Sequence, residues 1–151
     1  MKVSKISYNG LNLIKKYEGF KSKPYKCPAG IATIGFGSTY YPGGKKVSLS
    51  DPAISEEQAT LLLKDLLITF EKAVDSYTRD DITQHQFDAL VCFAYNVGTN
   101  ALRTSTLLKK VNANPSDPSI KQEFLKWNKA NGKALPGLTK RRQEESELYG
   151  S

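Results

Sequence analysis

The sequence of 151 residues is short of the groups that most catalytic and redox sites use. It has one histidine, two cysteines and no apolar run long enough to span a bilayer. Any serine, histidine and aspartate triad would need His85, which lies in the polar first turn of an expected helix, where a solvated histidine is the ordinary case. Cys27 and Cys92 match no metal or redox spacing, so we expect reduced thiols, no disulfide, no metal and no other cofactor.

Acidic residues are almost absent from the first fifty positions. Glu18 is the only one there, among nine lysines, so this segment carries a formal charge of +8. The whole chain has a charge of +7 and a pI near 9.3, which favours a polyanionic partner such as nucleic acid, a membrane surface or an acidic cell wall. A basic surface that only aids solubility is an equally simple explanation.

The patterns of known nucleic-acid binders are missing around the lysines. We find no helix-turn-helix, ribonucleoprotein or zinc-finger pattern, so nucleic acid is not expected as the primary partner. No glycine pattern follows a strand and opens a helix with a lysine placed to hold phosphates, which disfavours nucleotide binding. The N-terminus has no hydrophobic segment after its lysines, so we expect neither a signal peptide nor insertion into a membrane, and synthesis in a cytoplasm.

What is present indicates one mostly helical α+β domain with a small β element near its start. Between Pro24 and Gly37, glycines, prolines and short β-type runs predict a small irregular sheet. Capping-box patterns at Ser55–Gln58 and Thr83–Gln86 open two helices. The expected helices run from about Ser7 to Glu18, 55–77, Thr83 to Gly98, a short one at Ala101 and Leu102, Ser105 to about Asn112, Asp117 to Trp127 with Asn131-Gly132 closing it, and Leu138 to Tyr149.

Glu18 is the candidate for acid chemistry. It is expected at or just past the end of the first helix, where Tyr17, Phe20 and Tyr25 can supply an apolar wall that favours a protonated carboxyl. The neighbouring lysines favour the carboxylate instead. On spacing alone, a surface glutamate that pairs with one of those lysines stays an open alternative.

At these residues the chain resembles the phage-type lysozymes, the endolysin family that includes the T-even and lambdoid phage enzymes. The matching motifs follow the family's order over nearly the whole chain, from about Leu11 to Leu148. They are Glu18-Gly19, Tyr25, Gly30, Thr33-Ile34-Gly35, Gly37, Gln86 to Leu90, Phe93 to Gly98, Ser105 to Leu108, Phe124, Trp127, Gly132, Gly137-Leu138, Arg141-Arg142 and Glu145.

The resemblance implies a muramidase that cuts the β-1,4 bond between N-acetylmuramic acid and N-acetylglucosamine in peptidoglycan. It implies a lysozyme-like fold for residues 1–151, with a small β lobe at about 19–54, a linking helix at about 55–77, and a helical lobe at about 83–149 that includes the N-terminal helix. The substrate cleft of such an enzyme lies between the lobes. The partner is then bacterial peptidoglycan, and we expect a monomer.

In such enzymes a glutamate protonates the leaving oxygen, an aspartate nine residues later helps to activate water, and a threonine six beyond holds that water, which inverts the configuration. Glu18 and Thr33 match this pattern, but Cys27 occupies the aspartate position. Three hypotheses follow for Cys27: a base for the attacking water, a nucleophile, or a residue that only shapes the site. Lys23 and Lys26 are expected to raise its thiolate fraction.

Other roles are carried over from the resemblance in the same way. Arg141 or Arg142 is expected to pair with Glu18, and Cys92 is expected to be a small buried group of a core helix. The substrate contacts carried over are Tyr95, Asn96 and Thr106.

The function expected from the sequence is therefore a metal-free endolysin of phage-induced lysis, with Glu18, Cys27 and Thr33 as catalytic residues. It is made in the host cytoplasm and reaches the wall after the membrane is permeabilised. A catalytically impaired wall-binding or toxin-like lysozyme module is the alternative, and a basic nucleic-acid binder is the third hypothesis.

Overall fold

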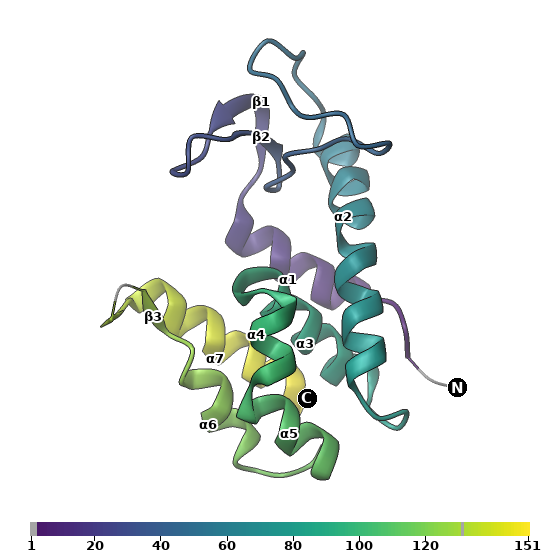
Figure 1. The fold of residues 1–151 in the computed structure, drawn as a ribbon, viewed down its shortest axis with the longest axis vertical. Helices are drawn as coiled ribbons and strands as arrows, with labels where there is room; N and C mark the ends of the chain where they lie inside the picture. The colour runs from purple at the N-terminus through teal and green to yellow at the C-terminus, as the bar shows by residue number, and fades with distance from the viewer. Residues whose placement is uncertain (1–2, 131) are drawn as a thin grey trace. The chain divides into compact units, whose positions relative to one another are not determined.

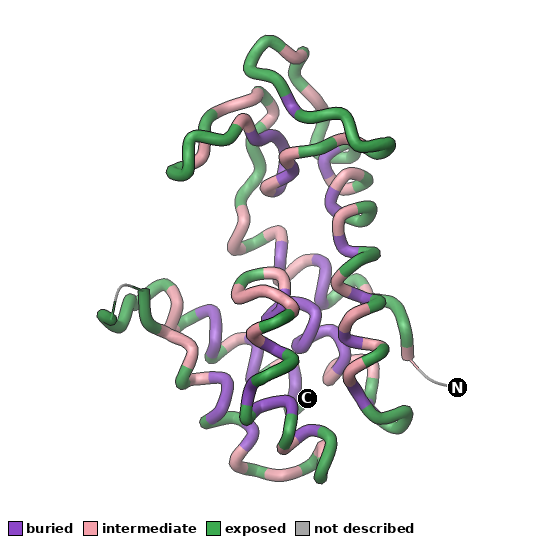
Figure 2. Tube along the Cα trace, in the orientation of Figure 1, coloured by how far each residue is buried: buried purple, intermediate pink, exposed green. Residues whose placement is uncertain are grey.

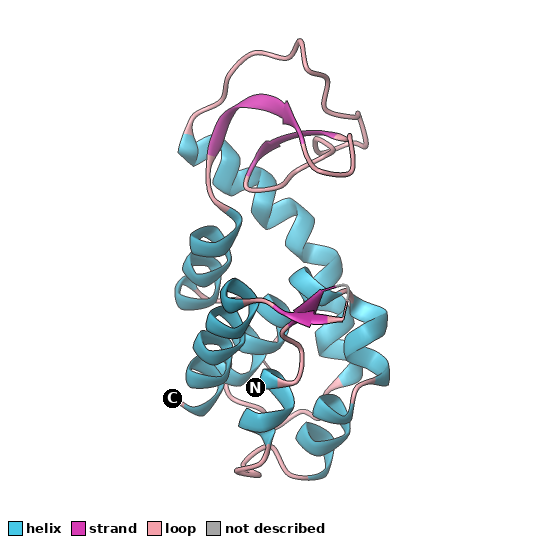
Figure 3. Ribbon diagram, turned by 90° about the vertical axis from the view of Figure 1, so that its left-hand side faces the viewer, coloured by secondary structure: helices cyan, strands magenta, loops and turns pink. Residues whose placement is uncertain are grey.

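The computed structural model describes residues 3–130 and 132–151. They form the expected α+β fold, in which helices predominate (Figures 1 and 3). The chain divides into two compact units: the β unit, Ile14–Ile68, and the helical unit, which holds the described residues up to Leu13 and those from Thr69 onward. The elements are α1 (Tyr8–Glu18), β1 (Lys21–Lys26), β2 (Ala32–Gly35), α2 (Glu56–Tyr77), α3 (Gln84–Val97), α4 (Thr99–Thr104), α5 (Thr106–Ala113), α6 (Ile120–Leu125), β3 (Lys129–Ala130), β4 (Lys133–Ala134) and α7 (Pro136–Gly150).

Two helices begin at the capping boxes that the sequence indicates. The Ser55 Oγ accepts from the Gln58 backbone N–H at 3.1 Å, and the Gln58 Oε1 accepts from the Ser55 N–H at 2.9 Å. Thr83 and Gln86 make the same reciprocal pair, at 3.1 and 2.9 Å. Each box satisfies two backbone donors that a helix start otherwise leaves without partners, so α2 and α3 begin where the sequence predicts.

Helix α3 forms the centre of the core in the helical unit. Its residues 87–94 are all buried, which Figure 2 shows as a continuous buried stretch of the trace. The Phe93 ring meets the rings of Phe124 and Trp127 edge-on, with centroids 5.6 and 5.5 Å apart. The expectation that this helix is buried on every side, with Cys92 inside it, is confirmed.

The β unit is built on the antiparallel pair β1 and β2. Tyr25 lies opposite Thr33, so their side chains share one face of the ribbon. Gly35 ends β2 with a φ of 68° and packs against α2: a Cβ added there would lie 3.0 Å from the Cβ of Ala59. Both the backbone conformation and this close approach require glycine.

Two local expectations differ from the structure. The helix expected from Asp117 begins at Ile120, because the Asp117 carboxylate accepts from the backbone N–H and the hydroxyl of Ser119, both at 2.8 Å. These bonds hold residues 117–119 in a turn that competes with the helix. The short hairpin of β3 and β4 was not expected, and of the predicted closing pair Asn131 lies outside the described residues.

Within the part of the chain that the structure describes, none of the helices has both the length and the apolar character that crossing a membrane requires.

Candidate active site

Glu18 is the last residue of α1. The N–H of Gly19 donates to the Lys15 carbonyl at 3.0 Å and the glycine takes a φ of 71°, which ends the helix and turns the chain towards β1. The Glu18 side chain is partly exposed. The predicted position of the carboxyl at a helix C-terminus is confirmed, and its role as an acid stays a prediction.

Cys27 begins the tight turn that joins β1 to β2. Its N–H donates to the Ile31 carbonyl at 3.0 Å, and the Gly30 N–H donates to the Cys27 carbonyl at 2.8 Å. These two bonds close the turn around the cysteine, whose side chain is partly exposed. The thiol is therefore held in place by backbone while it stays open to solvent.

The turn lowers the pKa of the Cys27 thiol below its ordinary value of 9.0. The main cause is a hydrogen bond from the backbone N–H of Ile31, followed by one from the N–H of Ala29, and the Thr33 side chain adds a smaller effect in the same direction. Donors that point at a sulfur stabilise the thiolate. From the sequence, Lys23 and Lys26 were expected to favour the thiolate. In the structure, the pKa of the thiol is lowered chiefly by backbone N–H groups of the turn.

Thr33 lies on β2 with only 3% of its surface exposed. Its hydroxyl donates to the Ile31 carbonyl at 2.9 Å, and its side chain helps to lower the pKa of the Cys27 thiol. A hydroxyl carries a single proton. That proton points at Ile31 in the structure, so the hydroxyl must turn towards the sulfur to stabilise a thiolate.

The structure thus places two of the three predicted catalytic residues on one hairpin. Cys27 lies in the turn between β1 and β2, Thr33 lies on β2, and Glu18 belongs to the same β unit. A carboxyl group, a thiol whose deprotonation is favoured, and a hydroxyl that can donate or accept are the groups that acid–base chemistry on a solvent-accessible substrate requires.

The three predicted substrate contacts lie in the helical unit. Tyr95 is partly buried near the end of α3, where its ring meets Phe70 at 5.2 Å. Asn96 follows it on the same helix and is exposed. Thr106 is the exposed first residue of α5. Their contact with substrate stays a prediction.

A buried charged cluster beside Asn96 was not recognised in the sequence as part of the site. Arg142 is fully buried, lies 2.8 Å from Glu145 and donates to the Asn96 Oδ1 at 2.8 Å. Arg141 also contacts Glu145, at 3.3 Å. Burial raises the pKa of the Glu145 carboxyl to about 6, although Arg142 and Arg141 act to lower it. In the sequence, the only signal of this cluster is that Arg142 and Arg141 precede Glu145 by three and four residues, a spacing that is equally common on exposed helix faces.

The predicted pairing of Arg141 or Arg142 with Glu18 stays a prediction.

The family described as phage lysozyme matches residues 15–145.

The chain belongs to the phage lysozyme family.

Individual relatives agree with this assignment. The endolysin of Bacillus phage B103 is 47% identical over 146 residues, which cover 95% of this chain and 53% of that protein, so the chain spans about half the length of this relative. The structure of the endolysin from Escherichia coli O157:H7 phage FAHEc1 matches with a TM-score of 0.88 at 34% identity, and covers 99% of this chain and 96% of that one. The muramidase domain of SpmX from Asticaccaulis excentricus matches with a TM-score of 0.84 at 31% identity, over 99% of both chains.

Among residues 3–130 and 132–151, no group of three or more His, Cys, Asp or Glu residues could hold a metal ion. His85 lies in the first turn of α3, where its Nδ1 is hydrogen-bonded to the Ser151 hydroxyl at 2.9 Å. Cys27 and Cys92 are free thiols.

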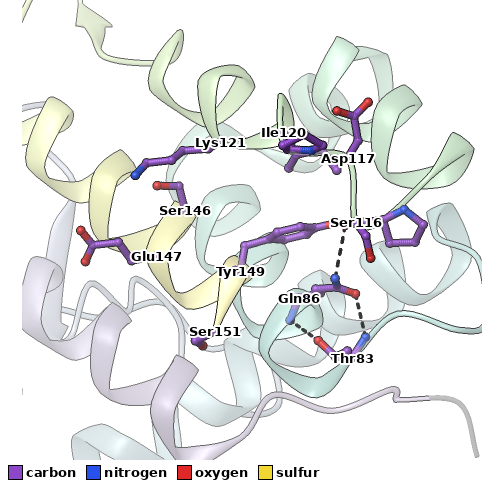
Figure 4. Close-up of a pocket in the computed structure, with 13 residues that line it drawn as sticks. Thr83, Gln86, Ser116, Asp117, Ile120, Lys121, Ser146, Glu147, Tyr149 and Ser151 are labelled. Carbon is purple, nitrogen blue, oxygen red and sulfur yellow. Dashed lines mark hydrogen bonds between the residues drawn. The ribbon is translucent and has the colours of Figure 1, made fainter.

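A separate pocket of about 490 Å³ lies where the first turn of α3, residues 115–118 and the end of α7 meet (Figure 4). Its polar groups are largely used within the protein: the Gln86 amide and the Tyr149 hydroxyl both donate to the Pro115 carbonyl, at 3.3 and 2.7 Å. None of the predicted site residues lines it. We assign it no part in the chemistry.

Proposed function

We propose that this chain is a peptidoglycan muramidase of phage-induced bacterial lysis, which hydrolyses the β-1,4 bond between N-acetylmuramic acid and N-acetylglucosamine with inversion of configuration. Membership of the phage lysozyme family and the likeness to a structure titled as a muramidase domain support the reaction class. The observation that carries the assignment of residues is the hairpin of β1 and β2, which places Cys27 in its closed turn and the buried Thr33 at the start of β2, in the same unit as Glu18.

In the proposed mechanism Glu18 is the general acid that protonates the leaving oxygen. Cys27, as a thiolate, takes a proton from the attacking water, and Thr33 holds that water from the far face of the sugar ring. A cysteine is only a few per cent ionised at neutral pH when its pKa is ordinary, so the donors of the turn are needed to make this thiol a useful base. The enzyme is made in the host cytoplasm and acts on the wall after the membrane is permeabilised.

The test is the clearing of purified cell walls by the wild-type chain and by Glu18→Gln, Cys27→Ala and Cys27→Asp. Loss of the acid is expected to reduce the rate by at least ~10²-fold. Cys27→Asp is expected to remain active, because a carboxylate is also a base. If the wild-type chain binds walls without clearing them, the impaired wall-binding module is the correct function instead.

The stereochemistry of the product separates the hypotheses for Cys27. NMR of the newly formed reducing sugar is expected to show inversion, because water attacks directly. Retention would mean that the thiol attacks the anomeric carbon and forms a covalent intermediate. Full activity of Cys27→Ala would leave Glu18 and Thr33 as sufficient for catalysis.

A further inference from the structure

The orientation of the Asn96 side-chain amide is fixed by its neighbour. The Arg142 Nη2 lies 2.8 Å from the atom of Asn96 that faces it. An arginine can only donate hydrogen bonds, so that atom must be the amide oxygen. The NH₂ group of Asn96 therefore lies on the other side of the amide. Because the side chain is exposed, both of its N–H donors are available to a ligand.

Arg142 is itself held firmly. It is fully buried, and its guanidinium lies over the face of the Phe93 ring, 5.1 Å from the centroid. The Phe93 ring packs edge-on against Trp127. A guanidinium that stacks on an aromatic ring and also donates from its edge has little freedom to turn.

Glu145 holds the edge of that guanidinium that carries Nε and Nη2. Its carboxylate is fully buried and lies 2.8 Å from the Arg142 Nε, with a further bond of 3.2 Å to Nη2. The same Nη2 donates to Asn96. A change in the position of the carboxylate would therefore move the nitrogen that orients the Asn96 amide.

Asn96 also lines a hollow of about 440 Å³ in the helical unit. The other residues around it are Val97, Lys126, Trp127, Lys129 and Leu138. An aromatic side chain, an amide that presents N–H donors, and two lysines make this hollow suited to a neutral acyl group with acceptor oxygens, with positive charge near it.

We propose that Glu145 is a positioning residue for substrate binding: it fixes Arg142, which turns the Asn96 amide so that its N–H groups donate to an amide carbonyl oxygen of the substrate. This inference rests on the proposed function, because it takes peptidoglycan as the ligand. Two groups of peptidoglycan carry such an oxygen, the N-acetyl group of the sugars and the stem peptide. Glu145 acts through two other side chains and touches no substrate itself.

The experiment is a double-mutant cycle on ligand binding. Dissociation constants are measured by calorimetry in a Glu18→Gln background, so that hydrolysis cannot intervene, with soluble peptidoglycan tetrasaccharides as the probe. Asn96→Ala and Glu145→Gln are each expected to weaken binding about three- to tenfold, as for the loss of one hydrogen bond. The double variant is expected to bind as Asn96→Ala does, because Glu145 acts through Asn96. Independent effects that multiply would overturn the proposal.

Glu71→Gln is the matched control. Glu71 is another buried carboxylate of the helical unit; its Oε2 accepts from the backbone N–H of Ile6 at 2.7 Å, and it does not line the hollow. Its substitution is expected to lower the melting temperature as Glu145→Gln does, without changing the dissociation constant by more than about twofold. Equal weakening of binding by both variants would show that Glu145 is only structural, which would overturn the proposal.

Asn96→Asp keeps the proposal testable if Glu145→Gln folds poorly. The new carboxylate can still accept from Arg142 but has no N–H to donate, so binding is expected to weaken as much as in Asn96→Ala. Unchanged binding would overturn the role of the N–H groups.

Probes with and without stem peptides identify the carbonyl that is bound. A loss confined to peptide-bearing glycan assigns the oxygen to the peptide, and an equal loss on both assigns it to the N-acetyl group. Failure of the proposed function would look different, because the wild-type chain would then not clear walls, whereas the role of Glu145 is decided by the dissociation constants alone.

Discussion

The two cysteines of this chain lie in opposite surroundings. Cys27 is partly exposed in a turn of the β unit, where backbone N–H groups point at its sulfur and lower the pKa of its thiol. Cys92 is fully buried in α3, where burial, followed by the charge of Glu145, raises the pKa of its thiol well above 9.0.

The comparison shows that the residue type does not decide the chemistry of a thiol. Access and the number of donors aimed at the sulfur decide it. Cys27 has both, which makes it a candidate base, whereas Cys92 has neither and fills space in the core. The following experiments sharpen or break this contrast.

The largest difference is expected in the rate of alkylation. In the folded protein, iodoacetamide should modify Cys27 at least ~10³-fold faster than Cys92, because a buried thiol reacts only when the structure opens. Mass spectrometry of peptides over time measures both rates in one sample. In denaturant the two rates should agree within a few-fold, and similar rates in the folded protein would contradict the assigned surroundings.

Alanine substitution should separate activity from stability. Cys27→Ala is expected to lower the rate of wall clearing about 10²-fold with little change in stability. Cys92→Ala is expected to retain activity but lose about 1–2 kcal/mol in the free energy of unfolding, because it leaves a small cavity. Turbidity assays measure the rate of wall clearing, and urea titrations measure the free energy of unfolding. If both variants lose only stability, Cys27 does not differ from Cys92 in the way proposed.

The pH dependence tests whether Cys27 acts as a base. A base must be deprotonated, so the activity of the wild type relative to that of Cys27→Asp should fall as the pH drops below 9.0 through the lowered pKa of the thiol. The general acid Glu18 is common to both proteins and cancels in this ratio, whereas an aspartate stays ionised at neutral pH. Parallel profiles for the two proteins would exclude Cys27 as the titrating group.

The smallest effect is expected from one donor of the turn. Thr33→Val removes a hydroxyl that helps to lower the pKa of the Cys27 thiol, so this pKa should rise slightly, because the larger effects of the Ile31 and Ala29 N–H groups remain. Ultraviolet absorbance of the thiolate follows this titration. Thr60→Val is the control, since that hydroxyl bonds to the Glu56 carbonyl on α2, and an equal shift there would refute the specific effect.

Features that depend on a few neighbouring residues were predictable from the sequence. The capping boxes at Ser55 and Thr83 fixed the starts of α2 and α3, because their hydrogen bonds close within one turn. The predicted start of a helix at Asp117 was wrong because of the same kind of local interaction. The Asp117 carboxylate accepts a hydrogen bond from Ser119, so the helix begins later in the chain. Glu18 was placed correctly because Gly19 ends a helix in a way that the sequence reveals.

Features that depend on folded geometry were not predictable. The donors of Ala29 and Ile31 reach Cys27 only after the turn closes, and backbone N–H groups leave no mark on the sequence. Arg141 and Glu145 are four residues apart in the sequence, but α7 is polar along most of its length, so its pattern does not show that both are buried. The tertiary environment of a charge has to be seen in the structure.

The Ile31 carbonyl has one further consequence. It accepts both the Thr33 hydroxyl and the Cys27 N–H, and a carbonyl oxygen has two lone pairs. When the hydroxyl turns to a newly formed thiolate, the carbonyl keeps its bond to the Cys27 N–H and the loop stays closed. The site can therefore release and regain a proton by rotation of a single C–O bond, without displacement of its backbone, and such low reorganisation is what a preorganised catalyst needs.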